Sequence, residues 1–436
     1  MGIRSYYKYF SFFLIILSIS SYFVGFIYGE NSAGGGLADY PNVWLNLQTF
    51  LNNSIIDGVH LTTTYDTEIY HSSRTPLVYI FHKLFNPFVE NEILFKRSVF
   101  FISLWVPILF YICLKQKFRK EENLLLLLIS ATIFLSPYFR TSSYWALEEN
   151  FGLITLLLSF LFLNKFLTNA NNISKDYYQL FLTVFFSSTC LYFDQKLAII
   201  PLICFVRIIF SDKPLKLKFF SFFAYFIFSL PFIYLISIWG GIMPPRDAEA
   251  RGVGYHHLFF YHLGYALTIV AFYLLPLLLF KSENLLKLWK NFFSQRKNYY
   301  LISIFFIYLI YLLFFHDYGE ERLLGKGFVH KTAILLFEEI FFQKVFIYFS
   351  FFFSWIIILI YLSDSLKNKL ILSYFFLFSI FVFPLMQEYF DPIIILMAFT
   401  FFDSKFFINY KRSILLYFYL SILLVFSNIY YYNLIN

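Results

Sequence analysis

Long apolar runs separated by short charged segments account for most of this chain. A transmembrane helix needs about 17 to 25 predominantly apolar residues to cross a bilayer, and such runs recur along the whole sequence. They predict an all-α polytopic membrane protein with about thirteen transmembrane helices, in a range of about eleven to thirteen. The predicted spans are residues 8–28, 96–114, 123–139, 149–164, 177–193, 197–210, 219–239, 258–280, 299–315, 344–362, 370–386, 392–402 and 413–430.

Three of these runs leave alternatives open. Residues 197–210 and 392–402 are short for a full crossing, which favours tilt, local thinning of the bilayer or half-helices buried in protein. Small residues in "NSAGGGLA" follow the first run, so a cleaved signal peptide is an alternative there. Its length of about 20 apolar residues favours a membrane anchor.

The segment after the first run, residues 29–95, mixes apolar and polar positions with a helical period. The stretch "NVWLNLQTFLNN" predicts an amphipathic helix lying flat on the membrane, with Asp39 and Pro41 at its start. A second such helix is predicted in "SRTPLVYIFHKLF", beginning after Pro76. The first helix has an apolar face of Val43, Leu47, Phe50 and Leu51, with Trp44 and Leu45 at its margins.

Composition agrees with this pattern. The 436 residues are 60% hydrophobic, 25% aromatic and 14% charged, which excludes a soluble globular protein. The three cysteines lie in apolar runs without C-x-x-C spacing, so neither a disulfide framework nor a zinc site is indicated. We expect one integral membrane domain over residues 1–436, with a core over 1–280 that includes the outer loop 29–95, and additional transmembrane helices over 281–436.

Charged residues divide unequally between alternate loops. The loops predicted to face the cytoplasm contain 22 of the 34 Lys and Arg but 7 of the 26 Asp and Glu, and this positive-inside pattern predicts a cytoplasmic N-terminus. Every histidine then lies in or beside an outer loop, which makes the outer face the predicted working face. The alternative is that these loops carry polar residues only for solvation. The histidines are His60, His71, His82, His256, His257, His262, His316 and His330.

Several segments together resemble the GT-C class of integral membrane glycosyltransferases. They are "GGGLADYPNVW", "SSRTPLVYIFHKLFNPF" and "SPYFRTSSYWALEENFGL". The segment "RDAEARGVGYHHLFFYHLGYALTIVAFYLLP" also weakly resembles the family that adds the terminal glucose to a lipid-linked oligosaccharide. As a topology, the resemblance covers residues 1–280.

The resemblance implies a hexosyltransferase that takes a sugar from a polyprenyl-phosphate donor. It implies transfer to a glycan or lipid-linked acceptor at the non-cytoplasmic face, in a bacterial inner membrane. The partners are then the lipid donor, the acceptor and membrane lipids, and no nucleic acid. In this chain Asp39 stands alone until Asp57 and Asp66, and a divalent metal needs at least two hard oxygen ligands. No cofactor is therefore expected, and a metal is not favoured.

Asp39 is the candidate catalytic residue. Sugar transfer to a hydroxyl needs a base for the acceptor proton, and a carboxylate within hydrogen-bond reach serves that role. The preceding glycines, Gly34 to Gly36, allow the backbone to approach a bulky sugar closely. The alternative is that Asp39 is a helix N-cap.

Basic side chains in the outer loops are candidates for binding the donor phosphate, because a guanidinium binds phosphate oxygens bidentately. The alternative is a solvated loop with internal ion pairs. A metal held by the neighbouring histidines is not favoured, because their spacing matches no zinc signature. The candidates are Arg246, Arg251, His256, His257 and Arg322, with Lys326 beside the last.

Aromatic and acidic side chains in other outer segments are candidates for binding sugar or acceptor, because ring faces contact C–H groups while carboxylates accept from hydroxyls. The alternatives are an aromatic belt at the membrane interface, acids at a helix start, and a simple turn. The candidates are Arg74, Arg140, Trp145, Glu148, Glu149 and Asp194.

The functional hypothesis is therefore membrane glycosyl transfer. One alternative is a polysaccharide polymerase or ligase that uses the same type of donor. Another is a flippase or transporter of lipid-linked glycans, which should have internal repeats and charged or broken segments near the midplane. The chain shows no convincing repeat, and its charges gather in the outer loops, so catalysis is favoured over transport.

Overall fold

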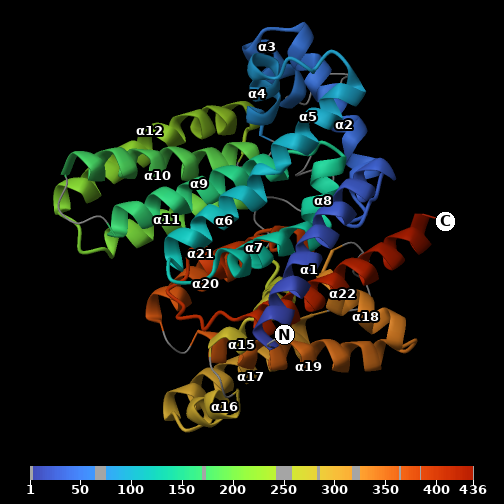
Figure 1. Cartoon of the computed structure of the whole chain (residues 1–436), viewed down its shortest axis with the longest axis vertical. Helices are drawn as coiled ribbons and strands as arrows, with labels where there is room; N and C mark the ends of the chain where they lie inside the picture. Colours follow the sequence, from blue (N-terminus) through green and yellow to red (C-terminus); the bar gives the residue numbers. More distant parts are fainter. Residues whose placement is uncertain are drawn as a thin grey trace. The chain divides into compact units, whose positions relative to one another are not determined.

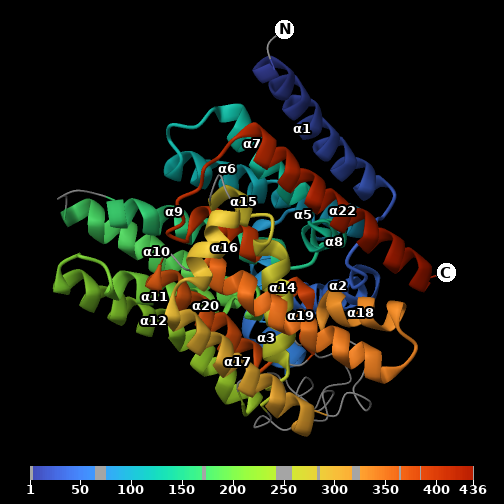
Figure 2. The same cartoon turned by 90° about the horizontal axis from the view of Figure 1, so that it is seen from below.

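The computed structural model describes the chain except residues 1–2, 64–74, 169–172, 242–257, 282–284, 317–324, 363–364, 383 and 436. Every regular element in the described part is an α-helix or a short 3-10 helix (Figures 1 and 2). Contacts divide the chain into two compact units, residues 1–256 with 417–436, and residues 257–416. The sequence predicts a division at residue 280, whereas these contacts place the boundary at residue 256 and group the C-terminal part of the last helix with the first unit.

The first unit contains the helices up to α12 and the C-terminal part of α22. Helix α10 packs along α9, α11 and α12, while α6 packs on α7 and α9, and α1 packs on α7. The elements are α1 (Ile3–Ile27), α2 (Gly36–Asn52), α3 (Ile55–Thr63), α4 (Leu77–Phe85), α5 (Glu92–Ser103), α6 (Trp105–Lys117), α7 (Asn123–Ala131), η1 (Thr132–Leu135), α8 (Pro137–Tyr144), α9 (Glu149–Thr168), α10 (Ile173–Phe193), η2 (Gln195–Leu197), α11 (Ile199–Ile209), α12 (Leu215–Trp239) and α22 (Tyr410–Ile435).

The second unit is built around α14, which is buried along almost its whole length by α18, α19, α20 and α21. Helix α19 also packs on α16 and α17. The elements are α14 (His262–Leu274), α15 (Leu278–Lys281), α16 (Leu285–Phe293), α17 (Arg296–Phe315), α18 (Gly327–Leu336), α19 (Ile340–Tyr361), α20 (Leu366–Ser379), η3 (Gln387–Tyr389) and α21 (Ile393–Thr400).

The chain is an all-helical polytopic membrane protein, since seven described helices are long and apolar enough to cross a bilayer. A further pair, Asn123–Leu135 with Pro137–Tyr144, is bent by 67°, as in a broken span or a re-entrant loop. The predicted number of thirteen is not confirmed. Helices α11 and α21 have 11 and 8 residues and extend only about 16 and 12 Å. The seven are Ser5–Ile27, Glu92–Lys117, Glu149–Thr168, Leu215–Trp239, Arg296–Phe315, Ile340–Tyr361 and Tyr410–Tyr432.

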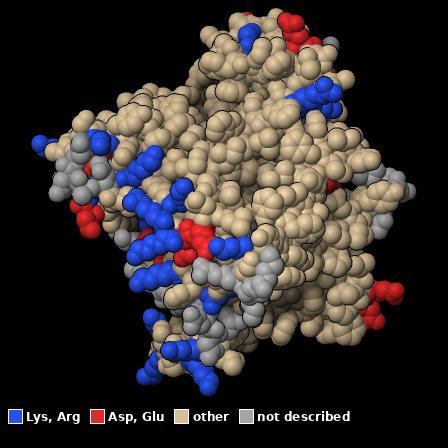
Figure 3. Space-filling view, in the orientation of Figure 1, with Lys and Arg blue, Asp and Glu red and all other residues tan. Residues whose placement is uncertain are grey.

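The long helices present apolar surface that no other part of the described chain covers. Only 17% of the apolar window of α12 is buried, and the same holds for α17. On α12, Phe219, Phe222 and Phe226 are each more than half exposed, which suits contact with lipid tails. On the face shown in Figure 3, charged side chains gather in a few patches, with wide uncharged areas between them.

Both helices predicted in the segment 29–95 are present. Helix α4 begins directly after Pro76, as predicted. Helix α2 buries Val43, Leu47 and Phe50, which confirms most of the predicted apolar face. It begins at Gly36, however, so Pro41 lies inside the helix and not at its start.

Helices α2, α3 and α4 pack on one end of the first unit (Figure 1). Their apolar side chains join Phe95 at the start of α5, Phe151 at the start of α9, Phe193 at the end of α10 and Trp239 at the end of α12 in one core. These four helix ends are all predicted to be outer ends. Predicted inner ends also meet, since Lys8 Nζ lies 2.8 Å from Glu122 and Lys213 Nζ lies 2.9 Å from Asp176. The predicted alternation of helix ends therefore agrees with the packing of this unit.

Candidate functional site

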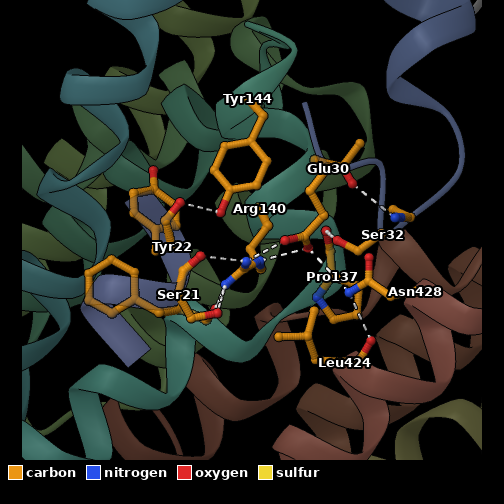
Figure 4. Close-up of polar contacts among 12 residues, drawn as sticks. Ser21, Tyr22, Glu30, Ser32, Pro137, Arg140, Tyr144, Leu424 and Asn428 are labelled. Carbon is orange, nitrogen blue, oxygen red and sulfur yellow. Dashed lines mark hydrogen bonds and ion pairs between the residues drawn. The ribbon is translucent and has the colours of Figure 1, made fainter. Parts of the chain in front are cut away.

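The loop between α1 and α2 is fixed to α8 by a buried ion pair between Glu30 and Arg140 (Figure 4). Arg140 Nε donates to Glu30 Oε1 at 2.8 Å, and Nη2 donates to Glu30 Oε2. The remaining N–H groups of Arg140 donate to the hydroxyl and carbonyl of Ser21 and to the carbonyl of Phe134. Arg140 is 2% exposed, and its five donors all bind groups of this chain.

This geometry gives Arg140 a different role from the predicted contact with sugar. Its guanidinium joins α1, the loop between α1 and α2, and α8, so we assign it a positioning role. The partner of Arg140 is Glu30, which was not among the predicted site residues. The available signal was that Glu30 is the first acidic residue after the first apolar run.

Further hydrogen bonds hold the loop between α1 and α2 in place. Ser32 Oγ donates to the carbonyl of Pro137, and the Ala33 N–H donates to Thr141 Oγ1 at 2.9 Å. From α22, Asn428 Nδ2 lies 3.3 Å from Glu30 Oε1 and Ser427 Oγ donates to the carbonyl of Ser32. The start of α2 is therefore held by both α8 and α22 (Figure 4).

Trp145, a predicted sugar-binding residue, lies directly against the start of α2. Its Nε1–H donates to the carbonyl of Glu30 at 3.0 Å. A Cβ added at Gly36 would overlap the indole ring and lie 2.9 Å from Thr141 Cγ2, so only glycine allows this approach. The predicted catalytic segment and the predicted sugar-binding segment are therefore in contact.

Lys96, which was not among the predicted site residues, lies beside the contact between Gly36 and Trp145. Lys96 Nζ is 3.7 Å from the centroid of the Tyr40 ring and 5.3 Å from that of Trp145, while Glu92, one turn earlier, is 3.5 Å away. Burial, and then the nearby Glu92 carboxylate, raise the pKa of Tyr40. Tyr40 is therefore a neutral phenol at neutral pH. The sequence signal was a Glu–Lys pair at i,i+4 directly before the second apolar run.

Asp39 lies in the first turn of α2 but does not cap it. The N-cap residue of α2 is Gly35, so the alternative that Asp39 is the N-cap is wrong. Asp39 is partly exposed, and its Oδ2 folds back so that a Cβ on Gly35 would be 3.0 Å away. A carboxylate there is stabilised by the positive end of the helix dipole.

The turn between α8 and α9 brings other predicted residues together. Glu149 is the first residue of α9, as the helix-start alternative expects. Its carboxylate also accepts from Ser142 Oγ at 2.9 Å and from Lys196 Nζ at 3.2 Å. Asp194 is 6% exposed and caps η2 by accepting from the Lys196 N–H. Both acids therefore have a structural function within the chain.

The rest of this turn is tightly packed. Glu148 is 3% exposed, and its carbonyl accepts from the Phe151 N–H. Ala146 has a φ of 50°, a left-handed conformation that is uncommon for a residue with a side chain. This conformation lets the Leu147 N–H donate a hydrogen bond to the carbonyl of Ser142 at 2.9 Å. The backbone is thereby held between Trp145 and Glu149.

No model of a protein family, no curated protein and no solved structure matches this chain.

The remaining predicted residues lie outside the described part of the chain. Among the described residues, no three His, Cys, Asp or Glu side chains are placed to hold a metal ion. The residues outside are Arg74, Arg246, Arg251, His256, His257 and Arg322.

Proposed function

We propose that this chain is an integral membrane glycosyltransferase that moves a sugar from a polyprenyl-phosphate donor to a glycan or lipid-linked acceptor at the non-cytoplasmic face. One observation supports this most. Two of the segments that carry the resemblance to GT-C enzymes, "GGGLADYPNVW" and "SPYFRTSSYWALEENFGL", are in contact through Gly36 and Trp145. They are 109 positions apart along the chain, and neither hydrophobicity nor helix packing alone requires them to meet.

In the proposed reaction, the acceptor hydroxyl oxygen attacks the anomeric carbon of the donor sugar. The bond from that carbon to the phosphate oxygen breaks, and the polyprenyl phosphate leaves with the electron pair. Asp39 takes the hydroxyl proton, since it is the partly exposed acid nearest the Gly36–Trp145 contact along the chain. The Trp145 ring, which is partly exposed, offers an apolar face to the sugar, and the Lys96 ammonium favours an anionic group near it.

Glu149 is a weaker candidate for the base than Asp39. Its two carboxylate oxygens already accept from Ser142 and Lys196. An ammonium beside a carboxylate favours the charged form and lowers its basicity. We therefore retain Asp39 as the proposed base and assign Glu149 to positioning the α8–α9 turn.

The test is transfer in membranes that contain the full-length protein, supplied with a panel of polyprenyl-phosphate sugars and endogenous acceptors. The proposal predicts that one donor of the panel is consumed, with release of polyprenyl phosphate and incorporation of its sugar. Movement of the lipid-linked sugar across the bilayer without its consumption would favour the flippase alternative. Growth of a repeating polymer would favour the polymerase.

A further inference from the structure

Helix α16 separates apolar from basic side chains around its axis. Successive residues of an α-helix are rotated by about 100°, which places Leu286, Trp289 and Phe293 on one side of α16. Lys290 and then Lys287 follow on the adjacent side. Leu286 is 72% exposed, Phe293 is exposed and Trp289 is partly exposed, and the Trp289 and Phe293 rings stack with 5.9 Å between their centroids. We term these three residues the apolar strip, which runs beside the lysines.

A different side of α16 packs on protein and fixes the direction of the apolar strip. Phe292 is 3% exposed, and α16 packs on α17 and α19. The carbonyl of Phe292 accepts from Asn298 Nδ2 of α17 at 2.7 Å. The apolar strip therefore lies between the side of α16 that is buried in the chain and the side that carries the lysines.

The connection to the next helix holds α16 near the membrane surface. Helix α16 ends at Phe293, and α17, which is long and apolar enough to span a bilayer, begins at Arg296. This step along the chain covers at most about 11 Å. Tyr299 and Tyr300, in the first turns of α17, are exposed, as is typical of aromatic residues at the level of the lipid headgroups. The start of α17, and α16 with it, therefore lies at that level.

The surroundings of the apolar strip carry a net positive charge. Residues 285–298 include Lys287, Lys290, Arg296 and Lys297 and no acidic residue. The last three are exposed, and Figure 3 shows Lys and Arg side chains gathered over α16 at its lower left. The positive-inside pattern predicts that this loop faces the cytoplasm. Anionic lipids give the membrane a negative surface potential on that side.

We propose that α16 lies in the surface of the bilayer and binds anionic phospholipids. The apolar strip enters the boundary between headgroups and acyl chains, as in amphipathic helices that lie on membranes. Lys290, Arg296 and Lys297 bind the phosphate groups of the lipids. An acidic protein would also suit the basic side chains, but the short link to α17 keeps the apolar strip at the depth of the lipid. The proposal concerns lipid binding alone and does not depend on glycosyl transfer.

The orientation of α16 is tested with a fluorescent label attached to Leu286→Cys or to Asn291→Cys. Asn291 is exposed on the side of α16 away from the apolar strip, and the three native cysteines are buried. The full-length protein is placed in nanodiscs of phosphatidylcholine with phosphatidylglycerol, and acrylamide is added to the water as a quencher. We expect quenching of the label at position 286 to be about fivefold weaker than at position 291. Equal quenching at both positions would overturn the proposal.

The choice of lipid is tested by measuring the shielding of the label at position 286 while phosphatidylglycerol replaces phosphatidylcholine stepwise. We expect the double variant Lys290→Gln with Lys297→Gln to raise the phosphatidylglycerol content needed for half-maximal shielding about fivefold. The control is Lys405→Gln with Lys411→Gln, which removes the same charge elsewhere in the second unit and should change nothing. All four lysines are exposed, so both variants should fold. Complete shielding in phosphatidylcholine alone, or an equal response of the two double variants, would overturn the assignment to anionic lipid.

Discussion

At the scale of single residues, the structure assigns precise tasks to side chains whose types, but not whose partners, are evident in the sequence. Arg140 stood out as an outer-facing arginine, yet its partner Glu30 lies 110 positions earlier. Nothing in the local pattern connects the two. A buried arginine needs a countercharge, but the sequence offers many acids for that role.

Glu30→Gln is expected to destabilise the protein, because it leaves the Arg140 guanidinium buried without its opposite charge. Breaking a buried pair costs about 3–5 kcal/mol, and we expect the low end because the Glu30 side chain is 15% exposed. Thermal unfolding in detergent measures the effect. Lys8→Gln, which breaks an ion pair with both partners at least one-third exposed, should cost less than about 1 kcal/mol. Equal losses in the two variants would contradict the role given to Glu30.

Gly36→Ala is expected to disrupt the contact with Trp145. The indole ring cannot withdraw easily, because its N–H is bonded to the Glu30 carbonyl, and overpacking costs typically about 1–3 kcal/mol. We expect a lower unfolding temperature together with slower sugar transfer. Leu37→Ala is the control, since Leu37 is 54% exposed, and it should leave both quantities near their parent values. Normal sugar transfer by the Gly36→Ala variant would show that the contact between Gly36 and Trp145 is not needed for activity.

At the scale of elements, the starts of helices were predictable where a strong local signal existed. Pro76 marks the start of α4 because proline suits that place in a helix. The start of α2 was misplaced because three glycines read as a loop, whereas the Gly36 N–H is held by Asn31 Oδ1 and Trp145 packs on the missing side chain. The hydrophobic period of the sequence does not predict these contacts, because they are long-range or specific to the fold.

The predicted number of spans is not confirmed, for a related reason. Helix α21 is entirely buried, and its residues are as apolar as those facing lipid. Hydropathy does not distinguish a short helix covered by protein from one covered by acyl chains. The length of the helix does distinguish the two cases, because α21 has 8 residues and a full crossing needs about 17 to 25.

Acid is expected to loosen helix α4. Burial lowers the pKa of His82 to about 3, against about 6.5 in an unfolded chain. Between these values the unfolded form binds the extra proton, so stability falls as the pH is lowered, by about 1.4 kcal/mol for each pH unit. The protection factor of the backbone amides of residues 77–85, which is their exchange rate corrected for the intrinsic pH dependence of exchange, should therefore fall between pH 7 and pH 4.

His82→Phe should remove this acid response, because the His82 ring already makes edge contacts with Phe95 and Phe151 and phenylalanine does not titrate. His60→Gln, which replaces an exposed histidine of the neighbouring helix α3, should retain it. An unchanged response in the His82→Phe variant would assign the acid sensitivity to another group.

At the scale of the whole molecule, polytopic helical architecture followed from apolar runs alone, and the grouping of helices into two units did not. Sidedness is predicted from charge. In the first unit, the predicted outer ends of α5, α9, α10 and α12 gather in one core, which agrees with the alternation of loops. The assignment of these helix ends to the outer face rests on the positive-inside rule.

Cysteine labelling tests this assignment. A cysteine placed at Ser54 should react with an impermeant reagent added from outside, and one placed at Lys120 should react only after the membrane is opened. Both positions are exposed, and the three native cysteines are buried, so background labelling is low. The reverse pattern would invert the topology and move the proposed site to the cytoplasmic face.

The central claim, that Asp39 is the base of a sugar transferase, is tested most directly by the transfer rate of the Asp39→Asn variant. The substitution keeps the size of the side chain and removes its ability to accept a proton. The account predicts a rate loss of about 10² to 10⁴ with an unchanged unfolding temperature. Asp57→Asn, at the exposed start of α3, should transfer sugar normally. An Asp39→Asn variant that turns over as fast as the parent would contradict the account.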